Sequence, residues 1–196
     1  MFARTERLLL RPSWPEDAAE LHQAIADEGI VRNLARAPWP YTVDDAVQFA
    51  TQAHDPLYPA FLLMLRTHGA PRIIGACGIG NDDGSAELGY WIARPYWGLG
   101  FATEASRAVV NIAKAIGHKK LTSSHFTDNP ASGNVLRKLG FQNTGETALR
   151  HSNGRGAAIT SALYVKALDG AGTEPSARLS PPAFSMRAQM ERLQAA

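Results

Sequence analysis

The sequence predicts a mixed α/β domain over residues 1–169, built around one sheet. Stretches with helical periodicity alternate with groups of short apolar runs, which is the element order of a sheet covered by helices. In the middle of the chain, a strand over residues 86–92 leads through a glycine-rich loop directly into a helix over residues 102–116. From residue 169 onward Gly, Pro, Ser and Thr dominate, so residues 170–196 are predicted to be a flexible tail with room for a short helix.

The N-terminal elements follow from local signals. Residues 5–11 contain three consecutive leucines and are followed by proline, which predicts an opening strand. Residues 15–27 predict a helix, because their apolar residues recur at helical spacing and Pro15 suits a first turn. A second helix is expected over residues 43–53, with Thr42 as its N-cap.

The central strands are separated by turn sequences. Two apolar runs, residues 61–66 and 73–79, flank a His-Gly-Ala-Pro segment and predict a hairpin. A further turn leads into the strand over residues 86–92, whose side chains alternate between two faces. One face is expected to carry Leu88, Tyr90 and Ile92, and the other Glu87, Gly89 and Trp91.

The C-terminal half repeats the alternation. The helix over residues 102–116 is followed by a glycine suited to end it, and then by a strand over residues 121–126. Asn129 is the expected N-cap of the next helix, which has proline at its first position and ends near Gly140. The last predicted strand covers residues 159–168.

Composition excludes several function classes. The formal net charge is only +2 and no long basic run exists, so nucleic acid is a poor partner. The longest apolar run, Phe61–Leu65, is too short to span a membrane. A single cysteine, Cys77, favours a reducing cytoplasm and reads as a buried strand thiol, and the six histidines show no metal-ligand spacing. We therefore expect a soluble cytoplasmic protein without a metal, as a monomer or homodimer.

The glycine-rich loop is the most informative segment. Gly98 and Gly100 lie directly before the predicted helix, whose first backbone N–H groups lack partners and face a positive dipole end. Glycines let a phosphate approach this backbone closely, so a pyrophosphate is the expected ligand. The alternative is that these glycines only make the turn. Other nucleotide motifs fail, because Thr103 stands where a dinucleotide fingerprint needs glycine, and the chain contains no Gly-Lys pair.

Three segments together resemble the GNAT superfamily of N-acetyltransferases, and within it the RimJ/RimL type that acetylates ribosomal-protein N-termini. They are Thr5–Ala18, Glu87–Ala105 and Asn129–Phe141, in the family's order and spacing, and the resemblance covers about residues 4–168. It implies a central, mostly antiparallel twisted sheet with a splayed central strand pair and helices on both faces. It also implies transfer of an acetyl group from acetyl-CoA to a primary amine, which attacks the thioester directly.

The resemblance places CoA on the second and third of these segments. Backbone N–H groups of Trp91 and Ile92 would meet the oxyanion. Most family members carry Gln or Arg where this chain has Pro95, which leaves phosphate binding to the backbone and removes a side-chain contact. The implied CoA-binding residues are Trp91, Ile92, Ala93, Arg94, Trp97, Gly98, Leu99, Gly100, Phe101, Ala102, Thr103, Asn129 and Asn134.

Four side chains are candidates for proton transfer. Glu87 is the first candidate for the general base, acting directly or through water; the alternative is an edge carboxylate paired with an arginine. Ser132 matches a serine that protonates the leaving thiolate, but it could be only a first-turn hydroxyl. His151 falls where RimL-like enzymes place a carboxylate base, although a histidine in a solvated loop is the plainer interpretation. Tyr164 is a further candidate acid or a core residue.

The acceptor stays open between two classes of amine, a protein N-terminus and a small molecule. In the family, the region of Trp39, Pro40 and Tyr41 lines the acceptor side, and a loop there would suit specificity better than core packing. A third hypothesis is a non-catalytic acyl-CoA binding module that has lost its base.

Overall fold

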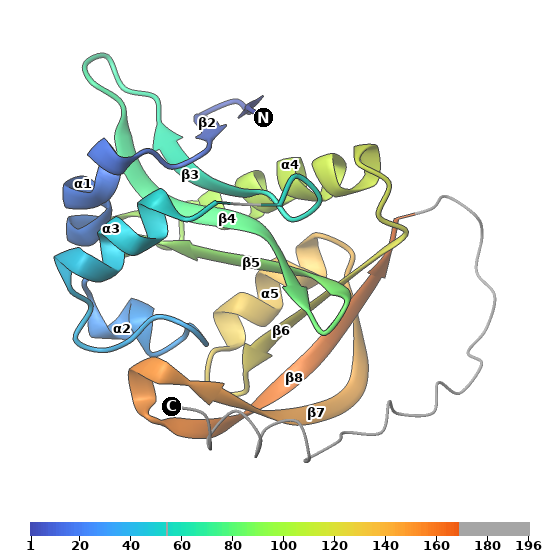
Figure 1. Cartoon of the computed structure of the whole chain (residues 1–196). Coiled ribbons are helices and arrows are strands. Elements are labelled where there is room, and N and C mark those ends of the chain that lie inside the picture. The colour runs from blue at the N-terminus through green and yellow to red at the C-terminus, as the bar shows by residue number, and fades with distance from the viewer. Residues whose placement is uncertain (54, 169–196) are drawn as a thin grey trace.

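The computed structural model describes residues 1–53 and 55–168. The predicted boundary at residue 169 and the tail over residues 170–196 lie outside this range. The described chain forms one eight-stranded sheet with helices on both faces (Figure 1), as the sequence predicts. The strands are β1 (Ala3–Arg4), β2 (Leu8–Arg11), β3 (Ala60–Leu65), β4 (Arg72–Asp82), β5 (Ser85–Ile92), β6 (Lys120–Phe126), β7 (Gln142–Ser152) and β8 (Ala157–Ala167). The helices are α1 (Ala18–Ile25), α2 (Glu28–Val31), α3 (Val43–Thr51), α4 (Phe101–Ala115) and α5 (Pro130–Lys138), with short 3₁₀ turns at Pro15–Asp17, Arg94–Tyr96 and Asn153–Arg155.

The sheet is antiparallel except at its centre. Its strand order is β1-β2-β3-β4-β5-β6-β8-β7, and only β5 and β6 run parallel. These two strands share one register pair, Glu87 with Thr122, whereas β5 pairs with β4 over its whole length. The central pair is therefore splayed beyond Glu87, and the two ribbons separate in Figure 1.

Two hydrophobic cores hold the helices to the sheet. On one face α4 and α5 pack over a core that includes Leu88, Val109 and Leu136. On the other face α1, α2 and α3 pack over a smaller core that includes Leu21 and Leu62. Successive side chains of β5 point to opposite faces of the sheet, so this strand contributes to both cores. Leu88 and Ile92 enter the first core, and Trp91 packs against the second.

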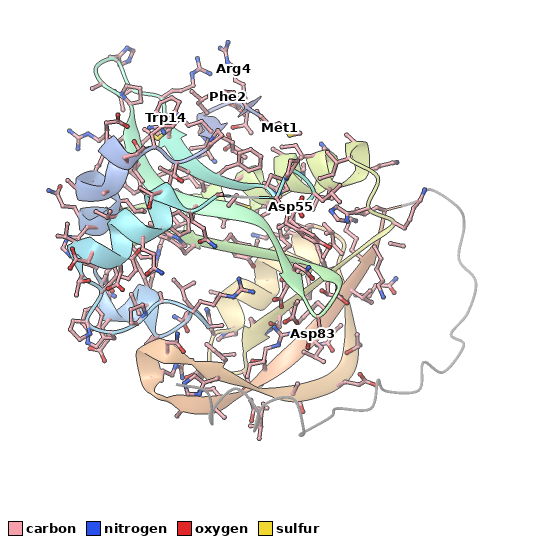
Figure 2. All side chains as sticks on the ribbon, in the orientation of Figure 1. Met1, Phe2, Arg4, Trp14, Asp55 and Asp83 are labelled. Carbon is pink, nitrogen blue, oxygen red and sulfur yellow. The ribbon has the colours of Figure 1, made fainter. Side chains whose placement is uncertain are left out.

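The predicted helix starts are confirmed by their caps. The Thr42 hydroxyl accepts from Asp45 N–H at 3.2 Å, and the Asp45 carboxylate accepts from Thr42 N–H at 2.8 Å, which forms a capping box at the start of α3. Asn129 caps α5, with Pro130 at its first position. The turn between β4 and β5 is also determined by its own residues. Asp83, labelled in Figure 2, and Gly84 have positive φ at its tip.

Three elements escaped the sequence analysis, namely β1, α2 and β7. In β7, ten of eleven residues are exposed or partly exposed, so the strand lacks the apolar alternation that reveals a half-buried strand. Its assignment depends on pairing with β8, which is interrupted by a register shift between Asn143 and Thr147. Within residues 1–53 and 55–168, no helix has both the length and the hydropathy needed to cross a bilayer.

Candidate active site

The splayed strands open into a cavity of about 570 Å³. Its walls are β5 and β6, the N-terminal turn of α4, one side of α5, and the segment from α2 to Ala35. Most of the residues assigned to the site by sequence line this one cavity. These are Glu87, Trp91, Ile92, Trp97, Gly98, Gly100, Phe101, Ala102, Thr103, Asn129, Ser132 and Asn134.

The backbone of β5 presents an unpaired edge to this cavity. Ala93 N–H donates to Ile74 O at 2.8 Å, so in the continuous β4–β5 register Trp91 also directs its peptide groups to β4. The intervening residues, Tyr90 and Ile92, therefore direct theirs toward β6, where the strands have separated. Of the two expected oxyanion donors, Ile92 lies on the open edge and Trp91 faces β4.

Side-chain donors confirm which edge is open. Ser123 Oγ on β6 donates to Leu88 O at 2.9 Å, and the Trp97 indole N–H donates to Ile92 O at 2.6 Å. These two carbonyl groups thus accept from side chains, at the end of β5 where the backbone of β6 is no longer in register with it. An extended ligand arm with its own N–H and C=O groups could pair with the same edge.

The N-terminus of α4 is prepared for an anion. Gly98 and Gly100 have φ of 75° and 84°, a left-handed conformation that glycine adopts without strain. The first backbone bond into the helix runs from Glu104 N–H to Gly100 O. The N–H groups of residues 101–103 consequently have no helical acceptor, and they lie at the positive end of the helix dipole.

A clamp from the N-terminal strands, which the sequence analysis missed, fixes this loop. Arg7 donates to Leu99 O at 3.0 Å, and its guanidinium pairs with Glu104 at 2.7 Å. Thr5 Oγ1 and Arg7 N–H also donate to the Glu104 carboxylate, at 2.6 and 2.9 Å. Burial opposes ionisation of Glu104, but these hydrogen bonds prevail and hold its pKa below the usual range.

Glu87 lies on the cavity wall as one member of a charged network. Its Oε1 accepts from Arg150 Nη1 at 2.8 Å and from Ser124 Oγ at 3.1 Å, and one fifth of the side chain is exposed. Arg150 also pairs with Asp82 at 2.8 Å. Burial disfavours the charged guanidinium, yet the two carboxylates raise the pKa of Arg150. The two sequence interpretations of Glu87 thus describe the same side chain, which is both paired with an arginine and open to the cavity.

Ser132 lies in the first turn of α5, beneath the open edge of β5. Its N–H donates to Asn129 Oδ1 at 3.4 Å, and its hydroxyl lies 2.9 Å from the Tyr90 hydroxyl. Tyr90 also lines the cavity and was not among the sequence candidates. Asn134 faces the cavity one turn along α5, where its side chain accepts from Arg137.

Other sequence candidates lie elsewhere. His151 is an exposed residue of β7 paired with Ala158, not a loop histidine, and the cavity wall includes its neighbour Arg150 instead. Tyr164 is buried in the α4–α5 core with its hydroxyl 3.4 Å from His125 Nε2. Arg94 points to the surface and pairs with Asp27 at 3.2 Å. Ala93 precedes the loop and Leu99 lies within it, and neither lines the cavity.

The segment that was expected to line the acceptor side lies outside this cavity. Tyr41 is buried in the α1–α3 core, and neither Trp39 nor Pro40 lines the cavity. The wall comes instead from α2 and the residues after it, which the sequence analysis left without a role. These are Gly29, Ile30, Asn33, Leu34 and Ala35.

The cavity lining also includes an unusual hydroxyl group. Ser161 on β8 is buried, and its Oγ has no hydrogen-bond partner among the residues that the structure describes. A search of the same residues finds no group of three or more His, Cys, Asp or Glu side chains suited to a metal ion.

Comparison with known proteins agrees with this architecture. A curated relative, an uncharacterized N-acetyltransferase named p20 from Bacillus licheniformis, is 28% identical over 149 residues, covering 72% of this chain and 82% of that protein. The crystal structure of ribosomal-protein-S5-alanine acetyltransferase from Vibrio fischeri matches with a TM-score of 0.72 at 19% identity, over 87% of this chain and 98% of that chain. The microcin C7 self-immunity acetyltransferase MccE, solved with acetyl-CoA and AMP, matches with a TM-score of 0.68 at 19% identity, over 83% and 93% of the two chains.

A family model described as acetyltransferase (GNAT) domain matches residues 7–142, which is more than half of the chain. The match contains Arg7 and Glu104 of the clamp, the glycine loop, the open edge of β5 and the whole of α5. This chain therefore belongs to the GNAT family of acetyl-CoA-dependent acetyltransferases.

Proposed function

We propose that this protein transfers the acetyl group of acetyl-CoA to a primary amine, by direct attack of the amine on the thioester. The observation that supports this most directly is the course of the cavity. It joins the unpaired amides of α4 to the carboxylate of Glu87, and it passes the open edge of β5 between them. One end thus suits a pyrophosphate and the other suits an amine.

The residues present fit CoA. The N–H groups of residues 101–103 would hold the pyrophosphate without a basic side chain at Pro95. Ile92 N–H, on the open edge of β5 at the end nearer α4, would pair with an amide carbonyl of the pantetheine arm. Asn129 and Asn134 on α5 would face the same arm. CoA supplies the activated acetyl group as a thioester.

The protein's own groups would then handle protons and charge. Glu87 would accept a proton from the acceptor ammonium, directly or through a water held with Ser124. Tyr90 N–H, on the open edge of β5 at the end nearer Glu87, would stabilise the oxyanion. Ser132 would donate to the departing sulfur. His151 remains the alternative base. Because it lies on β7 outside the cavity wall, Glu87 is the preferred candidate for the base.

The charges on the wall bear on the acceptor class. Glu87 is the one carboxylate among the described lining residues, and Arg150 and Lys138 also line the cavity. A polyamine would find little negative charge there, so we propose an acceptor with a single amine. A protein N-terminal α-amine, as in enzymes of the RimJ/RimL type, is the first choice, and a small-molecule amine is the second. Ser161 Oγ would find its missing partner in such an acceptor. We also propose that the protein is cytoplasmic.

A screen of acceptors tests this function. Thiol release from acetyl-CoA would be followed across peptides with different N-terminal residues and across monoamines, diamines and amino acids. We expect the largest rates with peptides and low rates with polyamines. Saturable transfer to polyamines alone would contradict the proposed acceptor. Tight acetyl-CoA binding without transfer to any amine would instead support a non-catalytic acyl-CoA binding module.

A further inference from the structure

We propose that Tyr90 is a positioning residue that directs the hydroxyl proton of Ser132 toward the departing sulfur. The inference rests on the proposed acetyl transfer and adds a residue to its leaving-group step. It is carried by one contact between β5 and α5, in which the Tyr90 hydroxyl meets two oxygen atoms of the same serine.

The geometry gives the tyrosine a choice of acceptor. Tyr90 Oη lies 3.0 Å from the backbone carbonyl oxygen of Ser132 and 2.9 Å from its Oγ. Both distances are normal for a hydroxyl donor, and both residues line the cavity. The Tyr90 ring packs against the α4–α5 core, and the N-cap bond from Asn129 holds the first turn of α5, so neither partner needs to move.

Counting protons separates two arrangements. The two hydroxyls carry one proton each. If Tyr90 donates to Ser132 O, the serine proton can point at Tyr90 Oη, and it then faces away from the cavity. If Tyr90 donates to Ser132 Oγ, the serine must direct its own proton elsewhere, and the cavity is the open side. The two states differ only by rotation of the hydroxyl groups.

The second arrangement serves collapse of the tetrahedral intermediate. When the C–S bond breaks, its electron pair passes to sulfur, and the Ser132 proton moves to that sulfur. The hydrogen bond from Tyr90 stabilises the negative charge left on Oγ until a proton from solvent restores the serine. Burial raises the pKa of Tyr90 and the hydrogen bond to Ser132 offsets this only in part, so Tyr90 is protonated before the step and can donate to Oγ.

A double-mutant cycle distinguishes positioning from packing. Tyr90→Phe removes the hydroxyl and keeps the ring, and Ser132→Ala removes the group on which the hydroxyl acts. Each single variant is expected to lose kcat by roughly tenfold to a hundredfold, a part of what a positioned acid contributes. The double variant should be within about twofold of Ser132→Ala, because Tyr90 acts only through Ser132. Acetyl-CoA affinity measured by calorimetry should be unchanged in Tyr90→Phe.

Tyr58→Phe is the matched control, because Tyr58 packs against the same core and contacts His118 instead of the cavity. It should retain the wild-type rate. Thiol release would be measured with the best amine as acceptor and also with water, as hydrolysis of acetyl-CoA. The double-mutant cycle can then be calculated from the rates of either reaction. Additive losses in the double variant, or a normal rate for Tyr90→Phe, would overturn the inference while leaving acetyl transfer intact. Absence of thiol release from the wild-type protein in both reactions would refute the transfer and the inference with it.

Discussion

Replacing Gly100 separates the effect of charge from that of backbone strain at the proposed pyrophosphate site. Gly100 is the N-cap of α4, with φ of 84° and ψ of 0°. A Cβ there would meet only Arg7 Nη2, at 3.6 Å, so strain is the main steric cost. A left-handed residue other than glycine costs about 1–2 kcal/mol, and Asn and Asp tolerate this conformation best. Gly100→Asn and Gly100→Asp should therefore unfold at similar temperatures.

The two variants should differ sharply in CoA affinity. An Asp carboxylate about 5 Å from a phosphate charge repels it by roughly 3 kcal/mol at an effective dielectric constant of about 20. The side chains of Asn and Asp can both accept from the helix amides, so the difference between the two variants reports the charge. We expect calorimetry to show that Gly100→Asp binds acetyl-CoA at least about a hundredfold more weakly than Gly100→Asn, with the gap narrowing in high salt. Equal affinities in two folded variants would show that the phosphates bind elsewhere.

Three further predictions address the base, the clamp and the tail. Glu87→Gln should lower kcat by roughly two to four orders of magnitude with little change in acetyl-CoA affinity, because the amide oxygen can still accept from Arg150 and Ser124 but cannot take up the proton. His151→Ala should retain most activity, and the reverse pattern would move the base to His151. Glu104→Gln should lower the free energy of unfolding at pH 7 by about 1–3 kcal/mol, because hydrogen bonds to a charged group are lost. Folding lowers the pKa of Glu104, so its contribution to the free energy of unfolding is present above the unfolded pKa and disappears as pH falls through the folded pKa. The melting temperatures of the wild-type protein and Glu104→Gln should therefore converge in acid. A difference in melting temperature that persists in acid would refute the electrostatic origin. Truncation after Asp169 should leave a folded protein that binds acetyl-CoA, and a large fall in melting temperature, or loss of a dimer, would show that the removed residues pack on the domain or on a partner chain.

Local signals in the sequence were sufficient for much of the fold. The caps at Thr42 and Asn129 fixed two helix starts, because each depends on residues within three positions of the cap. The glycines at 98 and 100 located the turn before α4 that is proposed to bind pyrophosphate, because a left-handed turn also depends on the residues within it. The alternation along β5 correctly placed Glu87 and Tyr90 on opposite faces of the sheet.

The composition of the site, by contrast, depends on contacts between distant residues. Arg150 pairs with Glu87 across 63 positions of sequence, and Tyr90 meets Ser132 across 42. The first contact exists because β7 joins the sheet through β8, and β7 has too little burial to be visible as a strand in the sequence. The second exists because β5 and β6 separate and α5 packs beside the gap. Sequence by itself determined which residues can bind a phosphate or carry a proton, since those properties are local; only the tertiary structure decided which of them meet, because strand order and splay result from the packing of the whole sheet.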